Sequence, residues 1–204
     1  MAELLEPLVA EGIYHIYNQS TGDELLFTND KDYFEFLTKL KKYVLCVGDI
    51  FSYCLLPNHY HLVERIKAAK DLLVYFAEKT EFKKTIAGKD LSLLLSRQFS
   101  DCFNSYAKYY NYTHARRWTL FRRAFRRKKV EGSDYLKTLI CYVNRNAVDC
   151  DMVKLCSQWK HSSYNALLSV KATLLQRDEV IEMFDDVENF KYCCSRPINL
   201  QMDM

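Results

Sequence analysis

The sequence lacks the features that would place it in a membrane or secreted class. No apolar run in its 204 residues approaches the ~20 residues that a membrane-spanning helix needs. The first residues, MAELLEPLVAEG, contain three acidic residues and no basic stretch, so they do not resemble a secretory signal peptide. We therefore expect a cytoplasmic protein that does not enter the membrane.

The cysteines do not form a recognisable metal motif. There are eight of them, but none stand in a CxxC spacing, and the adjacent Cys193 and Cys194 make a poor zinc pair. In the cytoplasm we expect these thiols to stay reduced and to serve as small buried hydrophobes. Internal repeats and low-complexity tracts are also missing. With 49% apolar residues, the chain can bury the core of one domain of ordinary size.

Acidic residues are missing from one segment, Arg116–Lys129, which reads RRWTLFRRAFRRKK and holds eight basic residues. Because the whole chain has a net charge of only +3, the remainder is net acidic. Guanidinium groups bind phosphates and aromatic rings stack on bases, so this mixture is typical of single-stranded nucleic-acid binding. A solvated surface is the alternative. The residues that we expect to bind DNA are Arg116, Arg117, Trp118, Arg122, Arg123, Arg126, Arg127 and Lys128.

Hydrophobic periodicity predicts an alternation of strands and helices. The predicted strands are residues 11–18, 50–56, 59–66 and 125–130. The predicted helices are residues 29–44, residues 90–110 with Asp90 as cap, residues 133–143 with Ser133 as cap, and residues 177–189. Residues 70–87 read as a polar, weakly helical connection. The order β-α-β-β-α-β predicts an α+β, ferredoxin-like antiparallel sheet with helices on one face, plus a C-terminal helical extension.

The stretch PNHYHLV places His59 and His61 one residue apart on a predicted strand. Alternate side chains of a strand share a face, so both imidazoles can bind one divalent cation. The alternative is two partly buried histidines that bond to backbone carbonyls. His15, on the first strand, could belong to the first or second shell of the same site or only pack beneath it.

The helix that starts at Asp90 ends in a tyrosine cluster. Tyr109 shares the apolar face of this helix with Gln98 and Cys102, the face that we expect to pack toward the sheet. Such a stripe is usually core. A phenol at its end, beside a metal site, could instead attack a phosphodiester.

Several motifs occur in the order in which a known family has them. These are YHIYNQ, SYCLLPNHYHLV, KYYNYTHARRWTLFRRAFRRKKV, SDYLKTLICYVNRNAV and QWKHSSY. The chain resembles the single-tyrosine HUH transposases, in the branch of the REP-associated tyrosine transposases. The resemblance covers residues 11–166. It leaves residues 1–10 as an N-terminal tail and residues 167–204 as a C-terminal helical extension or tail.

The resemblance implies DNA transposition by a single-stranded DNA endonuclease and strand transferase whose substrate is often a hairpin. His59 and His61 would hold Mg²⁺ or Mn²⁺, and Tyr109 would attack to give a 5′-phosphotyrosine link. Tyr109 is chosen because it aligns with the tyrosine two residues before the family's asparagine, here Asn111. The alternatives, in order, are Tyr110, Tyr106 and Tyr112.

The third metal ligand stays open. The family often takes it from one turn beyond the nucleophile, which here is Thr113, a poor ligand. Asn111 and His114 are the candidates in its place. The chain also departs from the family pattern at Trp118, at Arg123–Ala124 and at Asn146–Ala147.

Three functions therefore compete. The first is the metal-dependent tyrosine transposase or nuclease, as a monomer or a homodimer. The second is a catalytically inactive or domesticated relative that binds DNA hairpins. The third is an unrelated ferredoxin-like protein that binds RNA or a metal, with an accidental histidine pair.

Overall fold

Four antiparallel strands form the sheet in the computed structural model, which describes residues 6–79 and 91–198. The strands lie in the order β2-β3-β1-β4. Their bounds are β1 (Ile13–Gln19), β2 (Gly48–Leu56), β3 (His59–Ile66) and β4 (Arg126–Lys129). Pro57 and Asn58 make the tight turn between β2 and β3, as the sequence predicts. The ferredoxin-like α+β prediction is confirmed.

The helices follow the predicted pattern with local differences. Their bounds are α1 (Asp30–Tyr43), α2 (Ala69–Glu78), α3 (Leu91–Thr113), α4 (Ser133–Asp149), α5 (Tyr164–Leu168), α6 (Arg177–Met183) and α7 (Val187–Ser195), with a short 3-10 turn at Cys156–Gln158. Asn29 caps α1, because its side chain accepts hydrogen bonds from the backbone N–H groups of Lys31 and Asp32. Asp90 lies outside the described residues. Gly132, and not Ser133, occupies the cap position of α4.

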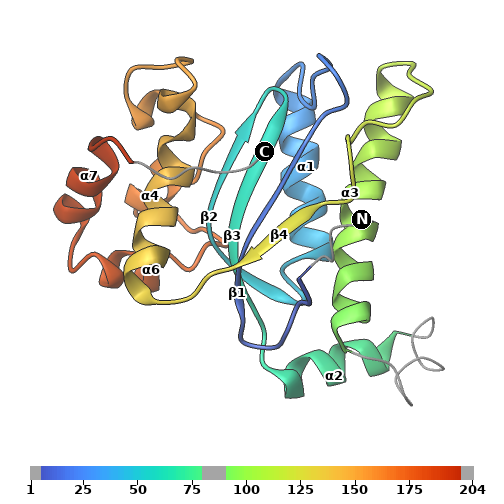
Figure 1. Cartoon of the computed structure of the whole chain (residues 1–204), viewed down its shortest axis with the longest axis horizontal. Helices are drawn as coiled ribbons and strands as arrows, with labels where there is room; N and C mark the ends of the chain where they lie inside the picture. The colour runs from blue at the N-terminus through green and yellow to red at the C-terminus, as the bar shows by residue number, and fades with distance from the viewer. Residues whose placement is uncertain (1–5, 80–90, 199–204) are drawn as a thin grey trace.

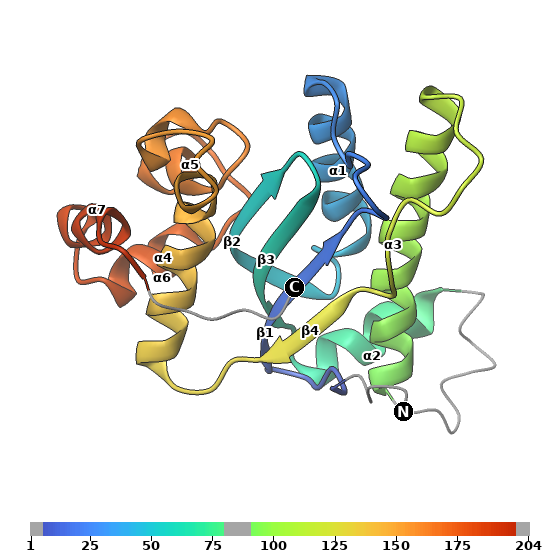
Figure 2. The same cartoon turned by 45° about the horizontal axis from the view of Figure 1, so that its top comes forward.

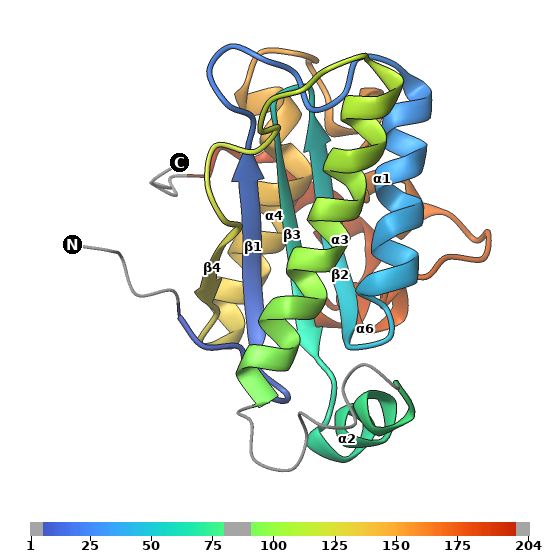
Figure 3. The same ribbon diagram turned by 90° about the vertical axis from the view of Figure 1, so that its right-hand side faces the viewer.

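Two layers of helices cover the two faces of the sheet (Figure 1). Helices α1 and α3 lie side by side on one face, as Figure 3 shows, and α4 lies on the other with α5, α6 and α7 outside it (Figure 2). Side chains of β3 alternate between the layers: Tyr60 and Leu62 join the core under α1 and α3, while Val63 joins the core under α4. The predicted C-terminal helices therefore complete the second face.

The QWKHSSY motif ties α4 to the edge strand β2. The backbone N–H of Leu55 donates to the carbonyl of His161 at 3.0 Å, and that of Ser163 donates to Tyr53 at 2.9 Å. The buried Ser163 hydroxyl also lies 2.6 Å from Asn144 Oδ1 on α4. These bonds cover the exposed edge of the sheet and fix the position of α4 along it.

The cysteines are free, and most of them behave as core residues. Cys54, Cys102, Cys141, Cys156 and Cys194 are buried. Among the helices that the structure describes, none is long and apolar enough to cross a membrane.

Candidate active site

His59 and His61 point from β3 toward α4, on the same face of the sheet, as the strand alternation predicts. Both side chains are buried, and their ring centroids lie 5.2 Å apart at an interplanar angle of 83°. His59 Nδ1 lies 2.8 Å from Asn58 Oδ1 and Nε2 lies 3.0 Å from Asn146 Oδ1, and the neutral ring donates its single N–H to one of these two oxygens. The turn and helix α4 thus fix the His59 ring from both of its nitrogens.

His15 belongs to the same cluster. Its Nε2 lies 2.8 Å from Nδ1 of His61, and the two nearly parallel rings meet edge to edge with centroids 5.0 Å apart. The Tyr17 ring lies beside both, with its centroid 4.7 Å from that of His15 and 6.0 Å from that of His61. His15 and Tyr17 share a face because they alternate along β1, and Tyr17 is in register with His61. Three histidines from two adjacent strands therefore lie in one buried layer.

A second tyrosine beside the histidines is Tyr142 of α4. Its ring centroid is 5.7 Å from that of His61, at an angle of 78°. Asn146 stands one turn further along α4, so the two side chains share a helix face. Asn146 hydrogen-bonds to His59 and interacts with the phenol of Tyr142. Tyr142, Asn146 and the two histidines therefore form one contiguous group.

Burial sets the protonation of this group. It lowers the pKa of His61 well below its usual value, helped by His15 and His59, and it lowers the pKa of His15 to about 3. Burial also lowers the pKa of His59, against the bond to Asn146. The imidazoles are therefore neutral near pH 7, the state in which a ring nitrogen can bind a metal. Burial raises the pKa of Tyr142 to about 12, although its bond to Asn146 acts in the opposite direction.

The donor set suits a divalent cation. Within residues 6–79 and 91–198, no group of three or more histidine, cysteine, aspartate or glutamate side chains is arranged to hold a metal. Two histidines and an amide are, however, close together: His61 Nε2 is buried without a hydrogen-bond partner in the described part of the chain, and His59 Nε2 faces the Asn146 oxygen. Two imidazole nitrogens and one amide oxygen fit Mn²⁺ or a similar ion.

The structure does not bring Tyr109 to the histidines. Tyr109 lies on α3, which packs with α1 on the opposite face of the sheet (Figure 3). Its ring is half-buried, and the ring centroids of Tyr109 and Tyr106 are 6.1 Å apart. The apolar stripe of α3 does pack toward the sheet, as predicted, but β3 presents Tyr60 and Leu62 to it. The prediction that Tyr109 lies beside the metal site is therefore wrong.

The other tyrosines of α3 have contacts or exposure that place them away from the histidines. Tyr106 is buried and donates to the carbonyl of Leu26 at 2.5 Å, which is a structural role. Tyr110 is buried against His114, with ring centroids 4.2 Å apart. Tyr112 is 91% exposed at the end of the helix.

Asn111 and His114 have structural partners on the same far side. The amide of Asn111 donates to the carbonyl of Trp118 at 2.9 Å and accepts from Arg116 at 2.7 Å. His114 Nε2 contacts the two carboxylate oxygens of the buried Asp32 at 3.0 and 3.1 Å. Neither residue is placed to complete a site at His59 and His61.

The basic segment divides into inward and outward residues. Arg116 pairs with Glu24 and lies over the Tyr110 ring, while Arg127 bonds to the carbonyl of Glu6 and lies over Phe125. These two arginines hold the segment to the fold. Arg117 and Trp118 lie in the exposed loop before β4, where the indole is 78% exposed.

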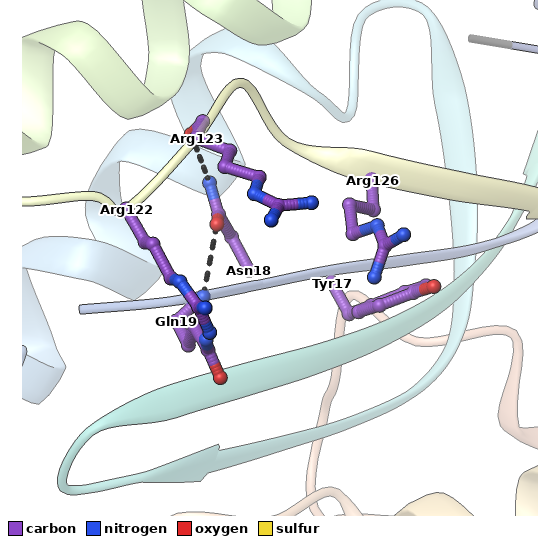
Figure 4. Close-up of a pocket in the computed structure, with 6 residues that line it drawn as sticks. All are labelled: Tyr17, Asn18, Gln19, Arg122, Arg123 and Arg126. Atoms are coloured by element: carbon purple, nitrogen blue, oxygen red, sulfur yellow. Dashed lines mark hydrogen bonds between the residues drawn. The ribbon is translucent and has the colours of Figure 1, made fainter. Parts of the chain in front are cut away.

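Three further arginines of the segment line a pocket at the end of β1. Arg122, Arg123 and Arg126 line a pocket with Tyr17, Asn18 and Gln19 (Figure 4). Asn18 Nδ2 donates to the carbonyl of Arg123 at 3.0 Å, which holds the loop against β1. Arg126 lies over the ring of Tyr17 at 5.9 Å. Because Tyr17 stacks on His15, the pocket adjoins the histidine cluster.

Lys128 extends this positive surface. It alternates with Arg126 on β4 and pairs in register with His15, so it lies on the same face of the sheet. Its ammonium group lies 5.6 Å from the centre of the Tyr135 ring. Of the eight predicted DNA-binding residues, Arg126 and Lys128 therefore lie beside the histidine cluster, and Arg122 and Arg123 line the adjoining pocket.

Sequence reasoning missed Tyr142, Asn146 and Tyr17. A usable signal was present for the first two. They stand four residues apart on a predicted helix, with a phenol and an amide on one face, inside the motif SDYLKTLICYVNRNAV.

Comparisons with known proteins identify the fold. No protein-family model matches the sequence, and no curated protein matches it. One solved structure that is similar is that of a REP-associated tyrosine transposase bound to a REP hairpin, with a TM-score of 0.58 and 14% identity. The match covers 82% of this chain and 86% of that one. The chain therefore has the fold of a REP-associated tyrosine transposase.

Proposed function

We propose that this protein cleaves and rejoins single-stranded DNA through a covalent link to Tyr142, with a divalent cation held by His59, His61 and Asn146. The observation that carries the proposal is the placement of α4. One face of this helix brings a tyrosine within 5.7 Å of one histidine ring and an amide oxygen within 3.0 Å of the other histidine. The family resemblance leads us to expect a nucleophile and a ligand one turn apart, and α4 supplies both.

The substrate class follows from the surface around the group. The pocket of Arg122, Arg123 and Arg126 would bind the phosphates of a strand that runs across the histidine face. The protein with the similar fold is bound to a REP hairpin, which supports a DNA hairpin as the substrate here.

The chain's own residues account for most of the proposed reaction. The Tyr142 oxygen attacks the phosphorus, and the bond between the phosphorus and the 3′-oxygen breaks. A 5′-phosphotyrosine and a free 3′-hydroxyl remain. The phenol proton is released to water as the new bond forms, and the departing 3′-oxygen takes up a proton from water to become the free hydroxyl, while the hydrogen bond from Asn146 stabilises the phenolate. A bound cation would polarise the scissile phosphate. A later attack by a 3′-hydroxyl on the phosphotyrosine rejoins the strands without ATP.

An adduct assay tests this function. End-labelled DNA hairpins are incubated with the protein and Mn²⁺, and covalent complexes are separated on denaturing gels. We expect an adduct from the unaltered protein, none with EDTA, and none from Tyr142→Phe. Tyr109→Phe is the matched control, since it removes the same hydroxyl from the opposite face, and it should retain the adduct. An adduct that survives Tyr142→Phe would contradict the assignment.

A second function is a DNA-hairpin-binding protein that does not cut. The burial of Tyr142 favours it, because the side chain is only 9% exposed and its pKa is raised to about 12, so the phenol is protonated. This reading predicts tight hairpin binding and no adduct from any hairpin.

A further inference from the structure

His15 makes the closest contact to either of the paired histidines from another strand. Its Nε2 lies 2.8 Å from Nδ1 of His61. Both rings are completely buried, and their planes lie within 19° of each other, as an in-plane hydrogen bond between ring nitrogens requires. The contact therefore joins two imidazoles that water does not reach.

A hydrogen bond between two neutral imidazoles needs one proton between the two facing nitrogens, here His15 Nε2 and His61 Nδ1. Each neutral ring carries one N–H and one nitrogen that accepts. If His15 donates, His61 accepts at Nδ1 and carries its own proton on Nε2, the nitrogen left without a hydrogen-bond partner among the described residues. If His61 donates, its Nε2 has a free lone pair and His15 carries its own proton on Nδ1, which likewise has no hydrogen-bond partner among the described residues. Only the second arrangement allows Nε2 to bind a cation.

We propose that His15 is a positioning residue that accepts the Nδ1 proton of His61 and thereby keeps the His61 Nε2 lone pair free for the metal. This inference rests on the proposed function. It assigns a role to the third histidine of the cluster: His15 acts through His61 and is not itself a ligand. The Nε2 of His15 is occupied by the contact, and its Nδ1 diverges from that nitrogen around the ring, so both cannot face the cation.

The role matters because a buried ligand needs a fixed tautomer. A partner on the second nitrogen of a metal-binding histidine holds the ring orientation and the tautomer, and its loss typically lowers metal affinity ~10–100-fold. Carboxylates and backbone carbonyls commonly serve as that partner. A neutral histidine provides the acceptor here without adding a negative charge to the layer.

Two substitutions separate acceptor chemistry from packing. His15→Phe keeps an aromatic ring between Tyr17 and His61 but removes the acceptor. His15→Gln removes the ring, and its amide oxygen can occupy the place of Nε2. Thermal unfolding and affinity for a DNA hairpin without metal should change little in either variant and serve as controls for the fold.

The experiment has two readouts on the full chain. Histidine-selective ¹⁵N NMR without metal reports which nitrogen of His61 carries the proton, and Mn²⁺ titration by electron paramagnetic resonance reports affinity. We expect His61 protonated on Nδ1 in the unaltered protein, a shift toward Nε2 in His15→Phe, and a Mn²⁺ affinity that falls ~10–100-fold in His15→Phe and largely recovers in His15→Gln.

The outcomes distinguish the two proposals. His61 protonated on Nε2 in the unaltered protein would overturn the role of His15, as would full Mn²⁺ affinity in His15→Phe. If the unaltered protein binds no Mn²⁺, the metal part of the proposed function fails, while the NMR tautomer of His61 still decides whether His15 is the acceptor. The NMR measurement needs no variant, so a failure of His15→Phe to fold leaves the test intact.

Discussion

The two faces of one sheet differ in chemistry although the same strands build them. On the face under α1 and α3, β1 and β3 contribute Tyr14, Ile16, Tyr60 and Leu62 to an aromatic and aliphatic core. On the face under α4, the alternate residues include three histidines, with Tyr142 and Asn146 opposite them. A tyrosine on the first face supports packing, whereas a tyrosine on the second meets metal-binding side chains. Position relative to the sheet therefore decides what each tyrosine can do.

The largest expected effect comes from removing the amide of α4. Asn146→Ala takes away the oxygen that faces His59, so we expect Mn²⁺ affinity and adduct formation to fall by at least ~100-fold, with hairpin binding retained. Asn111→Ala is the matched change on the far face and should leave Mn²⁺ affinity unchanged. Calorimetric Mn²⁺ titration and the adduct gel measure both. Equal losses from the two variants would remove the distinction between the faces.

The next effect concerns DNA affinity. Arg122→Gln with Arg123→Gln removes two charges from the pocket, and we expect weaker hairpin binding and a slope of log affinity against log salt that is lower by about 1–2. Arg116→Gln with Arg127→Gln removes the same charge from inward-facing residues. That pair should lower the melting temperature and leave the salt slope unchanged. Fluorescence anisotropy at several salt concentrations tests this, and a change of slope only in the second pair would contradict it.

The smallest effect lies in the core under α3. Glu64 is fully buried, and its two carboxylate oxygens lack a hydrogen-bond partner within the described residues. Burial raises the pKa of Glu64 well above its usual value, and Asp49 adds to the shift. An acid with a raised folded-state pKa destabilises the fold as the pH rises above its unfolded value of ~4.3.

Glu64→Gln should therefore flatten the loss of stability that begins as the pH rises above ~4.3, and an effect of ~1 kcal/mol would change the melting temperature by a few degrees. Glu35→Gln on α1 is the control, since it removes the same charge from a partly exposed carboxylate that pairs with Lys39. Parallel profiles for Glu64→Gln and the unaltered protein would show that Glu64 does not titrate as its burial implies.

The sequence predicted most of the fold because local rules determine it. The cap at Asn29, the turn at Pro57–Asn58 and the alternation along His59–Ile66 gave elements that the structure confirms within a few residues. Residues 177–189 are an exception, since Asp185 adopts a left-handed conformation with φ of 68° and the segment divides into α6 and α7.

The site was predicted only in part, because the hydrophobic periodicity of a helix does not indicate which face of the sheet that helix covers. Both faces of β3 are buried, so alternation placed His59 and His61 together without indicating whether α3 or α4 lies against them. Helix α3 has a clear apolar stripe, and this stripe led to the prediction that Tyr109 lies beside the metal site. Helix α4 is buried nearly all round from Leu139 to Ala147, so its periodicity did not mark Tyr142 as a site residue.

The most direct test of the account is to find which tyrosine carries the DNA. A trapped adduct is digested with nuclease and then with trypsin, and the nucleotide-bearing peptide is sequenced by mass spectrometry. Tyr142 falls in the peptide TLICYVNR, and Tyr109 and Tyr110 fall in YYNYTHAR. We predict the nucleotide on Tyr142 within TLICYVNR. A nucleotide on any tyrosine of YYNYTHAR would contradict the account and place the reaction on the opposite face of the sheet.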